Sequence, residues 1–423
     1  MKDKSNLIKL AQAHFGVEIT EDHCPEGVDP AVWDLLDKSQ FKITNAGKVC
    51  MPIPYDTRTN LQTILQNDTE FSTLGYNPHS DKLLWKGAPF EEVDIERVGI
   101  YLEKYRMRVK DGAIKSGVTA AAMENQFEPI KDYLEGLQWD KKPRIDNLLI
   151  DQYCADFEIN YTDLIKTMSS RWLISAVARI MDPGCEVHTC IALISVAKGV
   201  GKGFSLKALA GEEYFSNSNL DIGSKRGYMA IHQSGVWIWE LAEMASLQGK
   251  SAESFKAFIT GAWDRYTANY GKFPKHRPRR TVIALSANNV NILSDGPERR
   301  IWPILIKHNH TIDIDYIKDN RDQLWAEAVH RYKAGEPWHL DTKKLRDDLE
   351  AYQMGRFMID DPWSPKVLED LKRGGKSTTE IMDHLELPIS QQHTGNSKRI
   401  AQICKELGYV QKVENNQRKW VKR

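Results

Sequence analysis

The sequence has few cysteines, no net charge and no long apolar run, and each absence excludes a class of protein. None of its six cysteines forms a CxxC pair, and no histidine cluster supplies the missing ligands, so we expect no structural zinc site. Lysine and arginine together number 58, as do aspartate and glutamate. Because no overall field then attracts nucleic acid or a membrane, any such contact must come from a local patch. The thiols are expected to be reduced and mostly buried.

The apolar stretches are too short to cross a membrane. Residues 172–181, which Arg179 interrupts, and residues 190–197 fall well below the roughly 20 residues that span a bilayer. The N-terminal segment 1–15 lacks the apolar core of a secretion signal. We therefore expect a cytoplasmic protein with no membrane partner.

The chain is long enough for several domains, because its 423 residues exceed the size of a single small module. Short apolar runs at 190–196, 235–240 and 281–286 are typical of buried strands, and a helical stretch separates the first two. This alternation predicts a parallel sheet covered by helices. We predict five parts: a segment of unclear role (1–60), a helical domain (61–165), an α/β domain (166–310), a helical lid or linker (311–360) and a small C-terminal domain (361–423).

A glycine-rich loop follows the first predicted strand. Residues 196–203 read Val-Ala-Lys-Gly-Val-Gly-Lys-Gly, and a helical run begins at Phe204. Glycines allow backbone N–H groups to approach phosphate oxygens, and Lys202 would place a positive charge at the β- and γ-phosphates of ATP. The candidate phosphate ligands are Gly199, Val200, Gly201, Lys202, Gly203 and Phe204. The alternative is a plain glycine-rich turn between a strand and a helix.

The loop departs from the pattern G-x-x-x-x-G-K-[ST] at two positions. Val196 stands at the first glycine, and Gly203 stands where the pattern has a hydroxyl that binds Mg²⁺. Ser205 lies two residues on, and helical geometry would direct it elsewhere. A similar stretch at 374–377 follows a helical pattern instead of a strand, so Ser377 and Glu380 predict a helix capping box there.

Polar residues also follow the other two predicted strands. Glu240 and Glu243 lie at the end of the second predicted strand. One of these carboxylates can hold Mg²⁺, and the other can orient the water that attacks the γ-phosphate. Asn288 follows the third predicted strand, and its amide can contact both the γ-phosphate and the attacking water. Further on, Arg299 and Arg300 can stabilise phosphate transfer in a neighbouring subunit. The alternatives are solvated acids, an Asn-Asn turn and a salt-bridged arginine pair.

Two basic segments are candidates for contact with DNA. Residues 265–280 interleave aromatic side chains with Lys272, Lys275 and Arg277, a combination that suits single-stranded DNA. Residues 396–423 combine a helical pattern with two strand-like runs, as in a winged helix that reads the major groove. The candidate contacts in this segment are Lys398, Arg399, Arg418 and Lys419. The alternatives are an ordinary exposed loop and a helical cap with a solvated basic face.

With these residues in order, the chain resembles the virulence-associated protein E family of phages and mobile genetic elements, which is related to superfamily III helicases and primase-helicases. The resemblance extends from Asn60 to Pro303 and includes Tyr133-Leu-Glu-Gly-Leu-Gln-Trp-Asp140, Asp182-Pro-Gly184, Asp264-Arg-Tyr266 and Arg299-Arg-Ile-Trp-Pro303. It implies an α/β P-loop NTPase core of the AAA-like, superfamily III helicase type. An N-terminal helical domain and a C-terminal winged-helix-like domain would flank this core.

The resemblance further implies an ATP- and Mg²⁺-dependent motor that acts on single-stranded or origin duplex DNA as a homo-oligomeric ring, with a hexamer expected. It assigns phosphate binding to Lys202, the Walker B acids to Glu240 and Glu243, the sensor to Asn288 and a finger in trans to Arg299 or Arg300. Family members usually carry glycine at position 196 and Ser or Thr at 203, so weakened activity is expected.

Other functions stay open at this stage. The first sixty residues are too few for a primase domain, so a separate primase or host replication proteins would be needed. The main alternative function is a nucleotide-binding DNA adaptor or regulator without turnover. A non-enzymatic interaction protein would leave the ordered set of loop, acids, amide and arginines unexplained.

Overall fold

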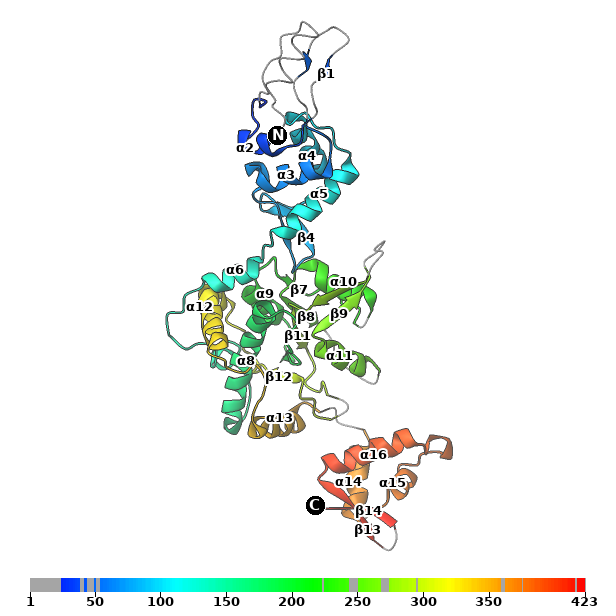
Figure 1. Cartoon of the computed structure of the whole chain (residues 1–423). Coiled ribbons are helices and arrows are strands. Elements are labelled where there is room, and N and C mark those ends of the chain that lie inside the picture. The colour runs from blue at the N-terminus through cyan, green and yellow to red at the C-terminus, as the bar shows by residue number, and fades with distance from the viewer. Residues whose placement is uncertain are drawn as a thin grey trace. The chain divides into compact units, whose positions relative to one another are not determined.

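The computed structural model describes residues 24–38, 42–43, 49–50, 54–222, 224–242, 250–267, 274–293, 296–358, 362–374, 376–414 and 417–422. The chain divides into two compact units, Met1–Pro129 with Gln233–Gly235, and Ile130–His232 with Val236–Arg423 (Figure 1). The second unit contains two separate hydrophobic cores, one around a parallel sheet and one in its C-terminal part.

Helices and a small antiparallel sheet share one core in the first unit. Val98 and Leu102, and likewise Ile114 and Val118, are spaced one helical turn apart and are buried. Trp33 is buried in the same core, so part of the segment before residue 60 packs with this unit. The elements are α2 (Pro30–Leu35), β1 (Lys42–Ile43), β2 (Val49–Cys50), α3 (Arg58–Asn67), the 3₁₀ helix η1 (Thr69–Phe71), β3 (Gly75–Asn77), β4 (Lys82–Trp85), β5 (Ala88–Pro89), α4 (Glu92–Lys104) and α5 (Asp111–Glu124).

The domain boundary expected at residue 165 lies elsewhere. The buried core of the first unit ends at Ala122, whereas Ile130, Leu134 and Ile145 belong to the core around the parallel sheet. Strands β3, β4 and β5 form an antiparallel sheet within the region expected to be helical. The sequence therefore predicted helices where α4 and α5 lie, but it did not show which core each later helix would join.

The second unit is a mixed α/β structure built on a five-stranded parallel sheet. Its strands are β6 (Cys190–Ile194), β7 (Phe215–Ser216), β8 (Ile238–Ala242), β11 (Val282–Ala287) and β12 (Ile301–Leu305), in the spatial order β12-β6-β11-β8-β7. All four pairings are parallel. Every residue of β6 and β11 is buried, which explains why both strands are continuous apolar runs in the sequence.

Sequence analysis located three of these strands and missed β7 and β12. β7 has two residues and carries too little pattern to be recognised. β12 contains Pro303, whose missing N–H argues against a central strand. Because β12 lies at the edge of the sheet, only one side of it needs ladder hydrogen bonds, and the proline is tolerated.

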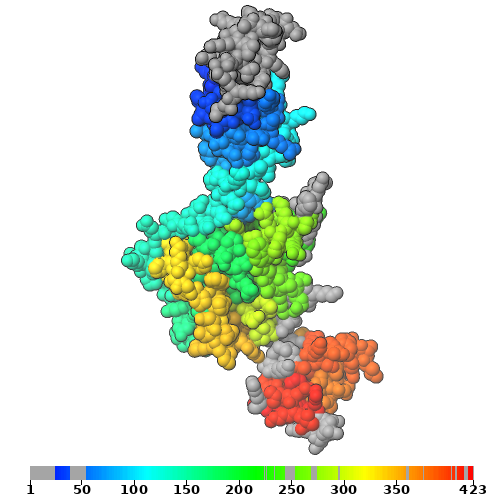
Figure 2. All heavy atoms as spheres, in the orientation of Figure 1, coloured from blue at the N-terminus to red at the C-terminus, as the bar shows by residue number. Residues whose placement is uncertain are grey.

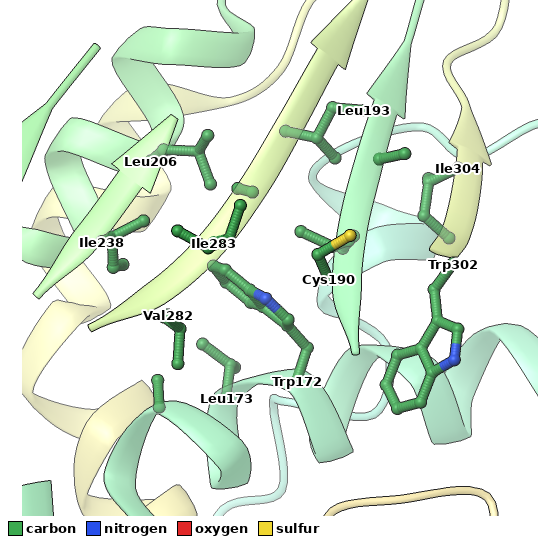
Figure 3. Close-up of a cluster of buried hydrophobic side chains, with 14 of the residues drawn as sticks. Trp172, Leu173, Cys190, Leu193, Leu206, Ile238, Val282, Ile283, Trp302 and Ile304 are labelled. Carbon is green, nitrogen blue, oxygen red and sulfur yellow. The ribbon is translucent and has the colours of Figure 1, made fainter. Parts of the chain in front are cut away.

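Helices cover the sheet. Figure 3 shows Trp172 and Leu173 of α8 packed against side chains of β6 and β11. In Figure 2 the yellow α12 lies at the surface beside the cyan α6 segment, where Tyr133 donates a hydrogen bond to Asp322 at 2.6 Å. No helix of the described residues is long and apolar enough to cross a membrane. The helices are α6 (Pro129–Gly136), α7 (Leu148–Asp151), η2 (Ile159–Tyr161), α8 (Thr162–Met181), α9 (Lys202–Ala210), α10 (Lys225–Ser234), α11 (Lys250–Thr260), α12 (Ile314–Lys333) and α13 (Lys343–Arg356).

The C-terminal part has helices and a hairpin around its own small core. The elements are α14 (Ser364–Lys372), α15 (Thr378–His384), η3 (Ile389–Gln391), α16 (Thr394–Glu406), β13 (Tyr409–Glu414) and β14 (Gln417–Lys422). The capping box predicted at Ser377 and Glu380 is confirmed, since each side chain accepts a hydrogen bond from the other's backbone N–H. Trp420 is buried in this core, and its backbone N–H donates to the Lys376 carbonyl oxygen.

Candidate functional site

The glycine-rich loop joins β6 to α9 at the carboxyl end of the sheet. Gly199 and Gly201 have φ values of +77° and +95°, a left-handed conformation that favours glycine. A Cβ on Gly201 would also lie 2.9 Å from Ile314 Cδ1, so packing disfavours a side chain there. The loop ends at Lys202, where α9 begins.

Lys202, Glu240 and Asn288 come from three elements and meet at this edge. The Lys202 Nζ donates a hydrogen bond to Asn288 Oδ1 at 2.9 Å, and Glu240 lies on β8 with 4% of its surface exposed. Burial lowers the pKa of Lys202, and the negative charge of Glu240 partly opposes this change. Because β6, β8 and β11 are parallel, their carboxyl ends share one edge, as the sequence predicted.

The Glu240 carboxylate occupies the space beside Gly203. A Cβ at residue 203 would lie 2.6 Å from Glu240 Oε2, so a serine at this position requires Glu240 to move. Ser205 does not supply the missing hydroxyl, because it is buried and its Oγ donates to the Lys202 carbonyl oxygen at 2.6 Å. This direction agrees with the prediction from helical geometry.

The other predicted ligands differ in exposure. Val200 is buried, whereas Phe204 is 70% exposed, so at position 204 only the backbone N–H would serve as a phosphate ligand. Glu243 lies outside the described residues. Within the described ranges, no three His, Cys, Asp or Glu side chains gather into a metal cluster. The single carboxylate of Glu240 is compatible with Mg²⁺, because this ion takes one or two carboxylates and fills its other positions with phosphate and water oxygens.

The two candidate arginines have different surroundings. Arg300 Nη1 donates to the Glu298 carboxylate oxygens at 3.0 and 3.1 Å, and its Nε donates to Thr260 Oγ1 at 3.1 Å. Arg299 is exposed, and its side chain has no polar partner among the residues that the structure describes. Both precede β12 at the amino end of the sheet, so within one chain they are not brought together with Lys202.

The first basic segment forms an antiparallel hairpin, in which β9 (Trp263–Tyr266) pairs with β10 (Lys275–Pro278). Lys275 lies opposite Tyr266, and Arg277 lies opposite Asp264. Lys272 lies outside the described residues.

A buried polar cluster anchors this hairpin. Arg279 donates to both Asp264 carboxylate oxygens at 2.6 and 2.7 Å, and His232 Nε2 lies 3.0 Å from the same carboxylate. All three side chains are less than 9% exposed. Burial raises the pKa of Asp264, but Arg279 and His232 outweigh that effect, so its pKa lies below the ordinary value. Sequence analysis included Asp264 only as part of a family motif and missed this cluster.

The C-terminal basic residues lie on α16 and the β13–β14 hairpin. Lys398 and Arg399 are exposed on α16, and the Arg399 guanidinium lies 3.8 Å from the centre of the Trp363 ring. Arg418 and Lys419 lie on β14, where Lys419 is directly opposite Lys412 of β13. Like charges opposite each other destabilise a hairpin.

Comparison with known families assigns the central part of the chain. A family model for the virulence-associated protein E-like domain matches residues 134–356. The chain belongs to this family. The matched range includes the glycine-rich loop, Glu240, Asn288 and both candidate arginines. The first unit and the C-terminal part lie largely or wholly outside it.

Three solved structures of the NrS-1 C-terminal region are also similar to the chain, each at 14% identity. An A form apo structure has a TM-score of 0.42 and covers 83% of this chain and 96% of that chain. A second A form apo structure has a TM-score of 0.44, with 87% and 100% covered. A further apo structure has a TM-score of 0.43, with 82% and 94% covered. No curated protein matches the chain.

Proposed function

We propose that the chain is an ATP-dependent DNA helicase or replication initiator of a phage or mobile genetic element, working as a homo-oligomeric ring. The observation that carries this proposal is the convergence of Lys202, Glu240 and Asn288 at the carboxyl edge of a parallel sheet. Ligands of open parallel sheets bind outside this edge. The family assignment agrees with the proposal, because its matched range includes all three residues.

Each residue then has a role set by its chemistry. The loop N–H groups and the Lys202 ammonium bind the β- and γ-phosphates of ATP. Asn288, which accepts a hydrogen bond from Lys202, would respond to the γ-phosphate. Glu240 would hold Mg²⁺, which neutralises charge on the phosphates when it is bound. Glu243 remains the candidate to orient the attacking water.

The missing hydroxyl at Gly203 is compensated by Glu240 in this proposal. The carboxylate lies in the space that a side chain at position 203 would take, so it can reach the metal without an intervening hydroxyl. Glycine at 203 and glutamate at 240 thus form a matched pair. The competing function, a nucleotide-binding DNA adaptor without turnover, is favoured by the same absent hydroxyl if no such compensation occurs.

The exposed Arg299 supports action as a ring. It lies at the amino end of the sheet and therefore cannot serve the nucleotide site of its own chain. An arginine that stabilises phosphate transfer in a neighbouring subunit must lie away from the nucleotide site of its own chain, as Arg299 does. Lys275 and Arg277 on the β9–β10 hairpin and the Lys412–Lys419 pair on the C-terminal hairpin are the proposed DNA contacts.

Steady-state ATP hydrolysis with Mg²⁺, with and without single-stranded DNA, tests this function. We expect DNA-stimulated turnover in the wild type and its loss in Lys202→Ala. Lys207→Ala is the matched control, because Lys207 lies in the same helix and pairs with Glu212 at the surface. Equal turnover in Lys202→Ala and wild type would refute the assignment of the loop. Nucleotide binding without turnover in the wild type would favour the adaptor.

A double-mutant cycle tests the matched pair. Gly203→Ser should weaken nucleotide-dependent Mn²⁺ binding, because the added Cβ displaces the Glu240 carboxylate. Glu240→Asp shortens the acid by one methylene and makes room, so the two changes together should cost less than the sum of the single changes. Additive losses, or tighter Mn²⁺ binding in Gly203→Ser, would contradict the pairing.

A further inference from the structure

A cavity of about 700 Å³ opens at the edge of the parallel sheet opposite the glycine-rich loop. It lies between the segments that precede β6 and β12 and the helix α13. The Cys190 N–H donates to the Arg300 carbonyl oxygen at 2.8 Å, which fixes the amino ends of β6 and β12 beside each other. Lys202 and Asn288 follow the carboxyl ends of their strands, so this cavity is separate from the proposed ATP site. Its volume is typical of small-molecule sites, which are about 300–1,000 Å³.

The cavity combines aromatic walls with charged side chains of both signs, three arginines (Arg299, Arg300 and Arg346) and two glutamates (Glu186 and Glu350). Trp302 and Trp338 contribute indoles, and Arg299 and Arg346 contribute guanidinium groups. Figure 3 shows the Trp302 indole at the start of β12, extending away from the direction of the strand. An indole stacks on planar rings, and a guanidinium group binds phosphate or carboxylate through paired N–H donors. The lining therefore suits a ligand with a planar ring and an anionic group.

Several polar groups of the lining already have partners. Trp338 Nε1 donates to the Glu186 carbonyl oxygen at 2.8 Å, and Arg346 Nη1 donates to the carbonyl oxygens of Leu340 and Asp341 at 3.1 and 2.9 Å. Arg299, in contrast, is exposed and has no polar partner among the described residues. The charge available to an incoming anion is therefore that of Arg299.

Two buried polar atoms of the lining residues have no hydrogen-bond partner within the described part of the chain, namely Trp302 Nε1 and His188 Nδ1. Trp302 is fully buried, so its donor has lost water without gaining an acceptor. His188 Nε2 lies 3.2 Å from a Glu186 carboxylate oxygen, and in the neutral tautomer in which Nε2 donates to that oxygen, Nδ1 is an acceptor. An unused donor and an unused acceptor match the edge of a nucleobase, which carries both.

We propose that this cavity binds a nucleoside phosphate, with the base stacked on the partly exposed Trp338 indole and the phosphate at Arg299. Stacking on aromatic side chains tolerates any base, and the Trp302 N–H and His188 Nδ1 would contact the base edge. The nucleotide is either free or one unit of a DNA strand. The site does not depend on ATP hydrolysis at Lys202.

The test measures quenching of 2-aminopurine riboside monophosphate by the full chain without Mg²⁺. Lys202→Ala is the background, so that the glycine-rich loop does not contribute. We expect saturable quenching, about tenfold weaker binding in Arg299→Ala, and about threefold to tenfold weaker binding in Trp302→Phe, which keeps a ring but removes the N–H. Trp172→Phe is the matched control, because Trp172 Nε1 is also buried without a partner but lies outside the cavity. Its affinity should equal that of the background protein.

Competition identifies the source of the nucleotide. Displacement of the probe by thymidine monophosphate supports a free nucleotide, and displacement by oligothymidylate alone supports a unit of a DNA strand. Absence of saturable quenching would overturn the proposal. Affinities that are unchanged in both Arg299→Ala and Trp302→Phe would also overturn it, as would equal losses in Trp302→Phe and Trp172→Phe.

Discussion

Two antiparallel hairpins carry the candidate DNA contacts, and they are anchored in opposite ways. The β9–β10 hairpin is held by the buried ion pair in which Arg279 donates to both oxygens of Asp264. The β13–β14 hairpin is held by the buried indole of Trp420, whose Nε1 donates to Thr378 Oγ1 at 3.1 Å. The basic side chains therefore lie on one hairpin that a buried ion pair holds in place and on another that a mostly apolar contact holds in place.

The difference lies in what each anchor loses when one partner is removed. A buried ion pair leaves an uncompensated charge behind, which is far more costly than the loss of an exposed pair. Replacing the buried indole of Trp420 with a phenyl ring leaves a small cavity and removes the donor to Thr378 Oγ1, and neither group of that contact carries a charge. The first hairpin should therefore be the more sensitive to single substitutions and to acid.

The largest expected effect is that of Asp264→Asn. This change keeps the shape of the side chain but leaves the Arg279 charge buried without its counterion, so the free energy of unfolding should fall by about 3–5 kcal/mol. Urea unfolding of the second unit measures the loss. Asp341→Asn is the control, because Asp341 pairs with Arg171 at a partly exposed site and should contribute at most about 1 kcal/mol. Equal losses in the two variants would remove the distinction between the anchors.

Trp420→Phe should have a smaller effect. The phenyl ring keeps most of the apolar contact but loses the hydrogen bond to Thr378, which costs about 1–2 kcal/mol. Hydrogen exchange of the amides in residues 409–422 reports this local loss. Val413→Ala serves as the reference, because Val413 is 69% exposed on the same hairpin and should change stability by less than about 0.5 kcal/mol. Exchange as slow in Trp420→Phe as in this reference would show that the indole is not the anchor.

Acid should weaken the charged anchor. Burial raises the pKa of Asp264, but its hydrogen bonds from Arg279 and His232 outweigh burial and hold the pKa below 3.8. Because the pKa is lower in the folded than in the unfolded chain, the ionised form stabilises the fold above that value, and this stabilisation is lost as the pH falls further. Urea unfolding at about pH 3 and about pH 7 should therefore show a larger difference for wild type than for Asp264→Asn. The same difference in both proteins would assign the acid sensitivity to other groups.

The sequence was sufficient to predict that Lys202, Glu240 and Asn288 lie near one edge of the sheet, because the signals for this arrangement are local. Each of three strands is a short apolar run that ends in a polar residue, and the rule that parallel strands share a carboxyl edge brings them together. The contact between Lys202 and Asn288 follows from that rule, although 86 residues separate them. The position of the Glu240 carboxylate beside Gly203 could not be predicted, because it depends on side-chain direction across two elements.

Other features have no local signal. The Asp264–Arg279 anchor joins two polar residues of a segment that looks like an exposed basic loop, and only the fold shows that both are buried. β12 contains Pro303, which is tolerated only because this strand lies at the sheet edge, and that position has no local sequence signal. The cavity at the opposite edge is lined from three distant segments, so the neighbourhood of Trp302 and Trp338 is a property of the tertiary structure alone.

The smallest expected effects are changes in the salt dependence of DNA binding, and they test whether the two hairpins contact different forms of DNA. Lys419→Ala removes one cation from β14, so the slope of log affinity against log salt for duplex DNA should become shallower by about 0.9. Lys275→Ala on β10 should reduce the slope for single-stranded DNA by about 0.7 and leave the duplex slope unchanged. Fluorescence anisotropy over a salt series measures both, with Lys344→Ala, which removes a surface lysine paired with Asp348, as the control. If both variants change both slopes equally, the two hairpins act on one DNA path; if neither changes a slope, DNA binds elsewhere on the chain.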